Sequence, residues 1–328
     1  MPGRSISIIL VILCAAPLLG KDIRIVTTTS DLKSIVEAVG GDHVSVNSIA
    51  NGKQDPHFIE ARPSYMIQLR KADLFIRIGL ELERGWESLV LEGSRNRKIQ
   101  IGSAGHLDVS SNIERLEVPV GEISRAMGDV HPLGNPHYWL DPYNGRKIAL
   151  TIANTLGAMD PENAADYAAN AAAFSRQIDM AMFGIPADES MWQQQLSGEL
   201  VPTEAGWHAL MAPHRGKKVV TYHRSWTYFL RRFGLVSAGE LESKPGIAPS
   251  PGHLKDLIES MNDSDVPVLI VASFKSNKAP DLVATKTGVK VVKVPYSTHG
   301  NAAADTYIAM IDQVVRQVAA AFNSSEGD

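Results

Sequence analysis

The strongest constraint on the fold of this chain is a regular alternation of short apolar runs with helical patterns. In the first part of the chain, the predicted strands occupy residues 23–26, 44–49, 74–78 and 98–101, and the predicted helices begin at Ser30, Pro63 and Gly79. In the last part, the predicted strands occupy residues 217–222, 266–272 and 289–294, with helical patterns at 226–233 and 253–261. Because parallel strands need a crossover between them, this order predicts two open α/β lobes built from βα repeats.

A long helical pattern lies between the two sets of βα repeats. Asp160 can cap its N-terminus, and Pro161 suits its first turn. Its apolar positions step by three or four residues, through Tyr167, Ala171, Phe174, Ile178 and Met182. This predicts a helix that joins the lobes. The expected segments are a signal peptide at 1–20, an N-terminal lobe at 21–158, a bridging helix region at 159–195 and a C-terminal lobe at 196–328.

The first twenty residues have the composition of a secretory signal peptide. Arg4 precedes the apolar run 6–13, which is too short to span a bilayer, and Gly20 precedes a charged residue. A buried N-terminal strand and a lipid anchor on Cys14 are the weaker alternatives. Since Cys14 is the only cysteine of the chain, the mature protein would contain none. A transition-metal site would then need histidine and carboxylate ligands.

Composition and charge narrow the class of partner. Hydrophobic residues make up 44% and charged residues 21% of the 328 residues, an ordinary globular mixture with enough chain for two cores. Lys and Arg number 32 and Asp and Glu number 36, so the net charge is −4, and no basic block is evident. Nucleic acid and anionic membrane surfaces are therefore poor candidates as partners. With the signal peptide removed, we expect a periplasmic or extracytoplasmic protein, and we expect it to be a monomer.

Three histidines lie in loops that such a fold can bring together. His57 and His223 each follow a predicted strand, one in each lobe, and ligands of open α/β sheets bind outside the carboxyl ends of the strands. His137 lies in a short loop between two prolines, which restrict its backbone. Each histidine alone fits an ordinary half-buried loop residue. Together, the three predict a metal site in the cleft between the lobes.

Several strings around these histidines resemble those of a known family. They are Asp-Pro-His-Phe-Ile-Glu at 55–60, Asn-Pro-His-Tyr-Trp-Leu-Asp-Pro at 135–142, Tyr-His at 222–223, Lys-Pro-Gly at 244–246 and Asp-Thr-Tyr at 305–307. In this order they resemble the periplasmic solute-binding proteins of zinc and manganese ABC importers. The resemblance implies two α/β lobes held by one backbone helix and a metal bound between them by His57, His137 and His223. It also implies capture of the metal for a membrane permease rather than catalysis.

The chain departs from this family at two places. Residues 104–134 hold only two histidines, where many zinc-specific members have a histidine- and acid-rich loop. The family's fourth ligand is usually a carboxylate, but the corresponding loop here contains no acid and offers His299; water, Glu240 or Glu242 are the alternatives. Because imidazole suits zinc and manganese is better served by carboxylate oxygens, we expect zinc, with manganese as the alternative.

Other interpretations remain open. His131 is either an accessory ligand or an exposed loop residue. Asp55, Glu60 and Asp141 either orient the histidines or cap helices and face solvent. Three imidazoles with an open position also describe a catalytic zinc, but no nucleophile or general-base motif accompanies them. A metal-dependent adhesin on the same fold is a further alternative.

Overall fold

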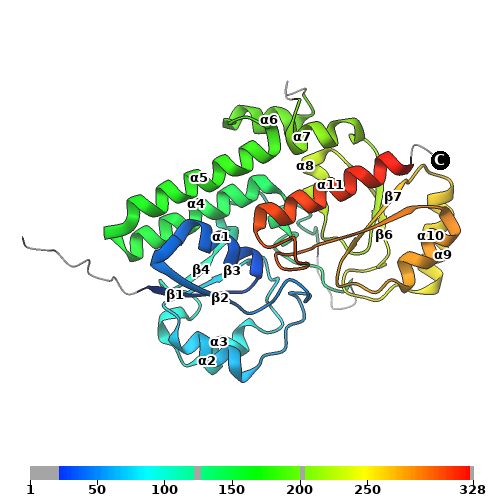
Figure 1. Cartoon of the computed structure of the whole chain (residues 1–328). Helices are drawn as coiled ribbons and strands as arrows, with labels where there is room; N and C mark the ends of the chain where they lie inside the picture. The colour runs from blue at the N-terminus through cyan, green and yellow to red at the C-terminus, as the bar shows by residue number, and fades with distance from the viewer. Residues whose placement is uncertain (1–21, 122–126, 200–203, 326–328) are drawn as a thin grey trace, which may run out of the picture.

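The computed structural model describes residues 22–121, 127–199 and 204–325, and these form two α/β lobes. Each lobe contains a four-stranded parallel sheet. Figure 1 shows the two sheets side by side, with long helices running across both of them. The fold predicted from the sequence is confirmed. The predicted signal peptide and Cys14 lie outside the described residues.

The first sheet has the strand order β2-β1-β3-β4. Its strands are β1 (Ile23–Thr27), β2 (Val44–Ser48), β3 (Leu74–Arg77) and β4 (His106–Asp108). Helix α1 (Ser30–Gly40) covers one face and buries Leu32, Ile35 and Val36 in the main core. Helices α2 (Pro63–Lys71) and α3 (Glu87–Ser94) close the other face around a second apolar cluster.

Two predictions for this lobe are wrong. Residues 98–101 do not form a strand, because Arg97–Ile99 is a short 3-10 turn in which the side chain of Asn96 accepts from the Lys98 amide. The fourth strand, β4, has only three residues and is too short to show an alternating pattern. Residues 79–86 are a turn rather than the start of a helix, since Gly79, Leu80 and Glu81 all have positive φ angles.

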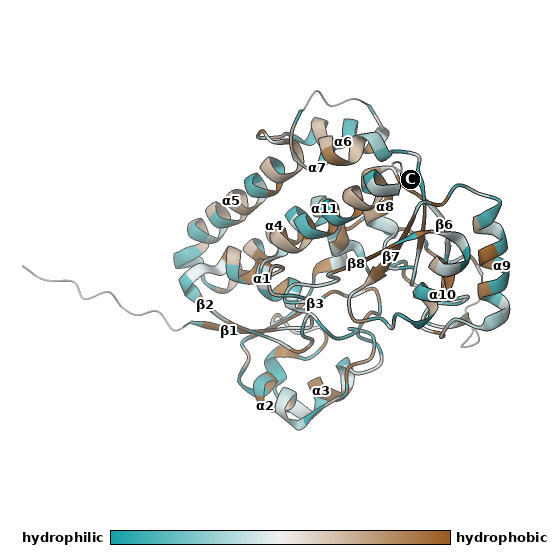
Figure 2. Cartoon of the chain, turned by 45° about the vertical axis from the view of Figure 1, so that its right-hand side comes forward, coloured by the Kyte–Doolittle hydropathy of each residue, from teal (hydrophilic) through white to brown (hydrophobic). Residues whose placement is uncertain are grey.

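The second sheet has the strand order β6-β5-β7-β8. Its strands are β5 (Lys218–Thr221), β6 (Val236–Glu240), β7 (Val268–Ala272) and β8 (Lys290–Val294). Edge strand β6 was not predicted because it contains no apolar run. Central strand β7 is apolar throughout and fully buried (Figure 2). Helices α9 (Pro251–Asn262) and α10 (Lys278–Thr287) pack on one face, and α8 (Thr227–Phe233) and α11 (Tyr307–Ser325) on the other.

A layer of helices connects the lobes. It contains α4 (Pro142–Met159), α5 (Ala164–Phe183), α6 (Glu189–Ser197) and α7 (Gly206–Met211), of which only α5 was predicted. The predicted bridging helix is α5, and all five of its predicted apolar positions are buried. It begins at Ala164 rather than after Asp160, because Pro161–Asn163 forms a separate 3-10 turn. Since α5 contacts α1 and α4 as well as α7 and α11, one continuous core extends through both lobes.

The lobes also touch directly. The hydroxyl of Ser30 donates to the carbonyl of Thr298 over 2.8 Å, and the amide of Thr298 donates to Asp31 Oδ1 over 2.9 Å. Burial raises the pKa of Asp31 to about 7. A Cβ at Gly52 would lie 2.0 Å from the carbonyl oxygen of Thr298, so only glycine fits there. Among the described residues, no helix is long and apolar enough to cross a lipid bilayer.

Candidate metal centre

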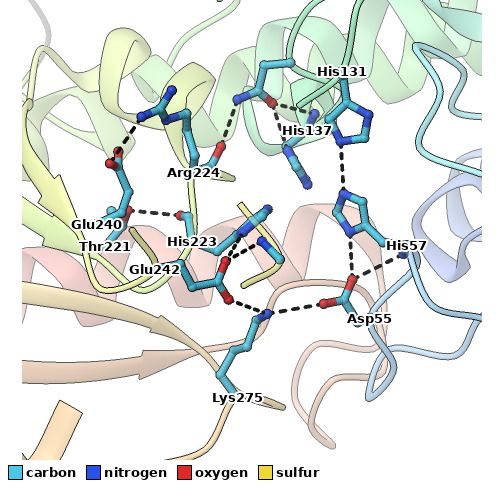
Figure 3. A network of polar contacts seen from close by, with 12 residues as sticks. Asp55, His57, His131, His137, Thr221, His223, Arg224, Glu240, Glu242 and Lys275 are labelled. Carbon is cyan, nitrogen blue, oxygen red and sulfur yellow. Dashed lines mark hydrogen bonds and ion pairs between the residues drawn. The ribbon is translucent and has the colours of Figure 1, made fainter. Parts of the chain in front are cut away.

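Three histidines from distant parts of the chain meet between the two sheets. His57 lies in the loop between β2 and α2, His137 in the loop before α4, and His223 in the loop after β5. One ring nitrogen from each lies within 4.8 Å of one ring nitrogen of the others. The ring centroids are 5.0 to 5.6 Å apart. Figure 3 shows the three rings turned toward one space.

Each of these rings is held by an oxygen acceptor at Nδ1. Asp55 Oδ1 lies 2.7 Å from Nδ1 of His57, Asn135 Oδ1 lies 2.8 Å from Nδ1 of His137, and Glu242 Oε2 lies 2.6 Å from Nδ1 of His223. Carboxylate and amide oxygens only accept, so each Nδ1 carries a proton, and it is the Nε2 lone pair that each ring can offer to a metal. Nε2 of His137 is buried and has no hydrogen-bond partner among the described residues. Such an arrangement is typical of metal-binding histidines.

The first two histidines are positioned by the same local turn. In Asp55-Pro-His57, the carboxylate accepts the His57 amide over 3.2 Å as well as the ring. In Asn135-Pro-His137, the amide oxygen accepts the His137 amide over 3.0 Å as well as the ring. Asn135 donates its Nδ2 to the carbonyl of Arg224, which turns its oxygen toward His137. The repeated Asp/Asn-Pro-His string is therefore the sequence signal for both turns.

A half-buried lysine links the groups that hold His57 and His223. Nζ of Lys275, in the loop after β7, lies 3.3 Å from Asp55 Oδ2 and 3.2 Å from Glu242 Oε1 (Figure 3). Burial alone would lower the pKa of Lys275, but the two carboxylates outweigh it and raise that pKa overall. Burial opposes ionisation of both carboxyls, but the hydrogen bonds from the His57 and His223 rings, and then Lys275, hold their pKa values below the ordinary range. No local pattern in the sequence marked Lys275.

His131 lies at this group of histidines. Its Nε2 is 3.3 Å from Nε2 of His57, and its ring centroid is 6.2 Å from that of His137. Burial, followed by the neighbouring His57 and His223, lowers the pKa of His131 to about 3. Burial also lowers the pKa of His137 well below its ordinary value. Both imidazoles are therefore neutral at pH 7, the form that binds a metal ion.

The remaining sequence candidates lie elsewhere. His299 is exposed, has a φ of 61° and does not belong to the group of converging histidines. Glu60 pairs with Arg62 at the surface. Asp141 pairs with the buried guanidinium of Arg232 and accepts the first amide of α4, so it orients the helix rather than a histidine. Of the three acids singled out, only Asp55 contacts a ring of the group.

Comparison with known proteins gives a consistent result. The family model described as "Zinc-uptake complex component A periplasmic" (ZnuA) matches residues 25–182 and 192–321. The manganese ABC transporter substrate-binding lipoprotein PsaA of Streptococcus mitis is 25% identical over 293 residues, which cover 87% of this chain and 85% of PsaA. The metal ABC transporter substrate-binding lipoprotein FimA of Streptococcus parasanguinis is 25% identical over 276 residues, which cover 82% of this chain and 78% of FimA.

Solved structures agree with this. A crystal structure of ZnuA superposes with a TM-score of 0.69 at 25% identity, covering 92% of this chain and 99% of ZnuA. The manganese-bound periplasmic metal binding protein from Candidatus Liberibacter asiaticus superposes with a TM-score of 0.66 at 20% identity, covering 90% of this chain and 98% of that protein, and shows the shared fold. The chain therefore belongs to the ZnuA family, whose members are substrate-binding proteins of metal ABC transporters and not enzymes.

Proposed function

We propose that this protein captures a zinc ion outside the cytoplasm through His57, His137 and His223 and delivers it to the permease of an ABC importer. The observation that carries the proposal is the common orientation of the three rings, each with Nδ1 held by an oxygen and Nε2 left to bind. Three convergent imidazole nitrogens provide a strong site for a divalent transition metal.

Zinc fits this set of donors better than manganese. All three donor atoms are nitrogens, whereas manganese prefers carboxylate oxygens. The two nearest carboxylates, Asp55 and Glu242, are already engaged by a histidine ring and by Lys275. Manganese is the second candidate because PsaA, at 25% identity, is named a manganese protein.

Delivery to a permease requires export. We propose that residues 1–20 act as a signal peptide and that the mature protein, residues 21–328, works as a monomer on the far side of the membrane. The relatives PsaA and FimA are named as substrate-binding lipoproteins of ABC transporters. Mass measurement of the exported chain, with gel filtration, tests cleavage and the monomeric state.

Competitive titration of the mature protein tests the metal. Zinc and manganese are titrated against a chelator of known affinity, and bound metal is counted by elemental analysis. The expected result is one zinc ion per chain and displacement of manganese by zinc. Tighter binding of manganese than of zinc would overturn the assignment of zinc while leaving metal capture intact.

A further inference from the structure

We propose that His131 is a fourth ligand of the metal and completes a site of four imidazole nitrogens. This inference rests on the proposed function. His131 lies six positions before His137 in the same loop, and its Nε2 lies 3.3 Å from Nε2 of His57. Figure 3 shows this contact as a dashed line between the two rings.

The distance between these two nitrogens is the one that a shared zinc ion requires. Four nitrogens at about 2.0 to 2.1 Å from a tetrahedral zinc lie about 3.3 to 3.4 Å from one another. Nδ1 of His57 carries the proton because it faces Asp55, so Nε2 of His57 is bare. In the metal-free chain, Nε2 of His131 must then donate a proton to it. When zinc binds, that proton moves to Nδ1 of His131, so both Nε2 lone pairs are available to the ion.

The backbone holds His131 at this place from the opposite side of the cleft. The amide of Asp129 donates to the carbonyl of Pro245 over 2.8 Å. A Cβ at Gly128 would lie 2.3 Å from the same carbonyl oxygen, so the two segments are in close contact. Residue 245 follows closely after Glu242, which holds His223. His131 is thus anchored on the C-terminal lobe while its ring contacts His57 of the N-terminal lobe.

His131 also lies between two cavities. One, of about 460 Å³, is lined by His57 and Arg84, among other residues, and the other, of about 320 Å³, by His137 and His223. His131 lines both of them. Its nitrogens are not among the group that lie within 4.8 Å of one another, so the His131 ring must move toward the three oriented histidines when it binds. The metal would therefore be enclosed by nitrogen donors, and the water expected at an open fourth position would be displaced.

The contribution of His131 is smaller than that of the other three ligands. Among the described residues, no oxygen acceptor holds its Nδ1, so the ring must be ordered when the metal binds. We expect His131→Ala to weaken zinc about tenfold to a hundredfold and His57→Ala to weaken it more. Manganese affinity should change little, because water replaces a nitrogen that manganese does not prefer. General damage to the fold would instead weaken both metals.

The position of His131 can be tested by a new absorption band in a cysteine variant. The mature chain has no cysteine, so His131→Cys introduces a single thiol. Cobalt bound to a thiolate absorbs strongly in the near ultraviolet, and the matched control His299→Cys places a thiol in an exposed loop. The expected result is this band in His131→Cys alone, together with weaker zinc binding by His131→Ala and unchanged binding by His299→Ala.

Two outcomes separate this inference from the proposed function. If His131→Ala binds zinc like the wild type and His131→Cys lacks the cobalt band, while His57→Ala loses zinc, the inference is overturned and the site has three histidines and water. If His57→Ala also binds zinc like the wild type, the proposed function itself fails.

Discussion

The two lobes hold their metal-binding histidines in different ways. His57 and His137 are oriented by a side chain two positions earlier, within a single turn. His223 is oriented by Glu242, 19 positions later, which reaches it only because its amide binds the carbonyl of Tyr222 beside the β5–β6 pair. The first two geometries are local, and the third depends on the fold of the C-terminal lobe.

This difference separates two ways of building a rigid site. A local turn orients its histidine within a few residues, although in the second turn Asn135 is also held by the carbonyl of Arg224. Positioning a carboxylate that is distant in the sequence costs more conformational entropy, but such a carboxylate can also contact other parts of the protein. Glu242 is an example, because Lys275 contacts both Glu242 and Asp55 and so links the groups that hold His223 and His57.

The largest expected effect concerns the whole centre. Zinc at a thousandfold excess over Kd should stabilise the folded protein by about 4 kcal/mol and raise its melting temperature. Burial lowers the pKa of His137, so the folded chain keeps this ring neutral below pH 6.5, where the unfolded chain takes up a proton. The metal-free protein should therefore lose stability as the pH falls below 6.5.

Melting curves at pH 7, 6 and 5, with and without zinc, check this. The rise caused by zinc should persist at pH 6 and shrink below it, as protons compete for the remaining imidazoles. An equal rise in His137→Ala would show that zinc stabilises the protein from another site.

The next effect compares the locally and distantly held ligands. Replacing His137 or His223 by Ala should each weaken zinc binding about a hundredfold or more, because about 10 to 16 kcal/mol of binding energy is shared among some four ligands. Competitive titration measures the loss. Wild-type affinity in either variant would remove that histidine from the site.

Smaller losses are expected from the groups that hold the rings. Asp55→Ala and Glu242→Ala should each weaken zinc about tenfold to a hundredfold. Asp55→Asn should recover most of the loss, because Asn135 performs the same role in the second turn. If Asp55→Asn were as weak as Asp55→Ala in titration, the charge rather than the local turn would hold His57.

The smallest effect is expected for Lys275, which links Asp55 to Glu242. Lys275→Met should change zinc affinity by less than about tenfold, because the lost bridge is partly offset by removal of a positive charge near the ion. Titration alongside Asp55→Ala measures both. A loss as large as that of Asp55→Ala would mean that the bridge itself keeps the two carboxylates in place.

Much of the fold followed from patterns that are long enough to read. The buried positions of α5 repeat at helical spacing, and β7 is an unbroken apolar run, so both were predicted. Strand β4 has three residues and edge strand β6 has no apolar run, so neither carries a periodic signal. The turn at residues 79–86 depends on positive φ angles at Leu80 and Glu81, which are not residues that mark such a turn.

The sequence by itself determined the two-lobe architecture and the turns that hold His57 and His137, because periodic patterns and short strings such as Asp-Pro-His describe interactions between residues close in the chain. The meeting of these two histidines with His223 was expected from their loops at strand ends and from the family resemblance. Only the tertiary structure decided that His131 lies against His57 while His299 faces solvent, and that Lys275 joins Asp55 to Glu242. These contacts join residues 33 to 220 positions apart. Their geometry depends on how two lobes pack through a common core, which no local pattern encodes.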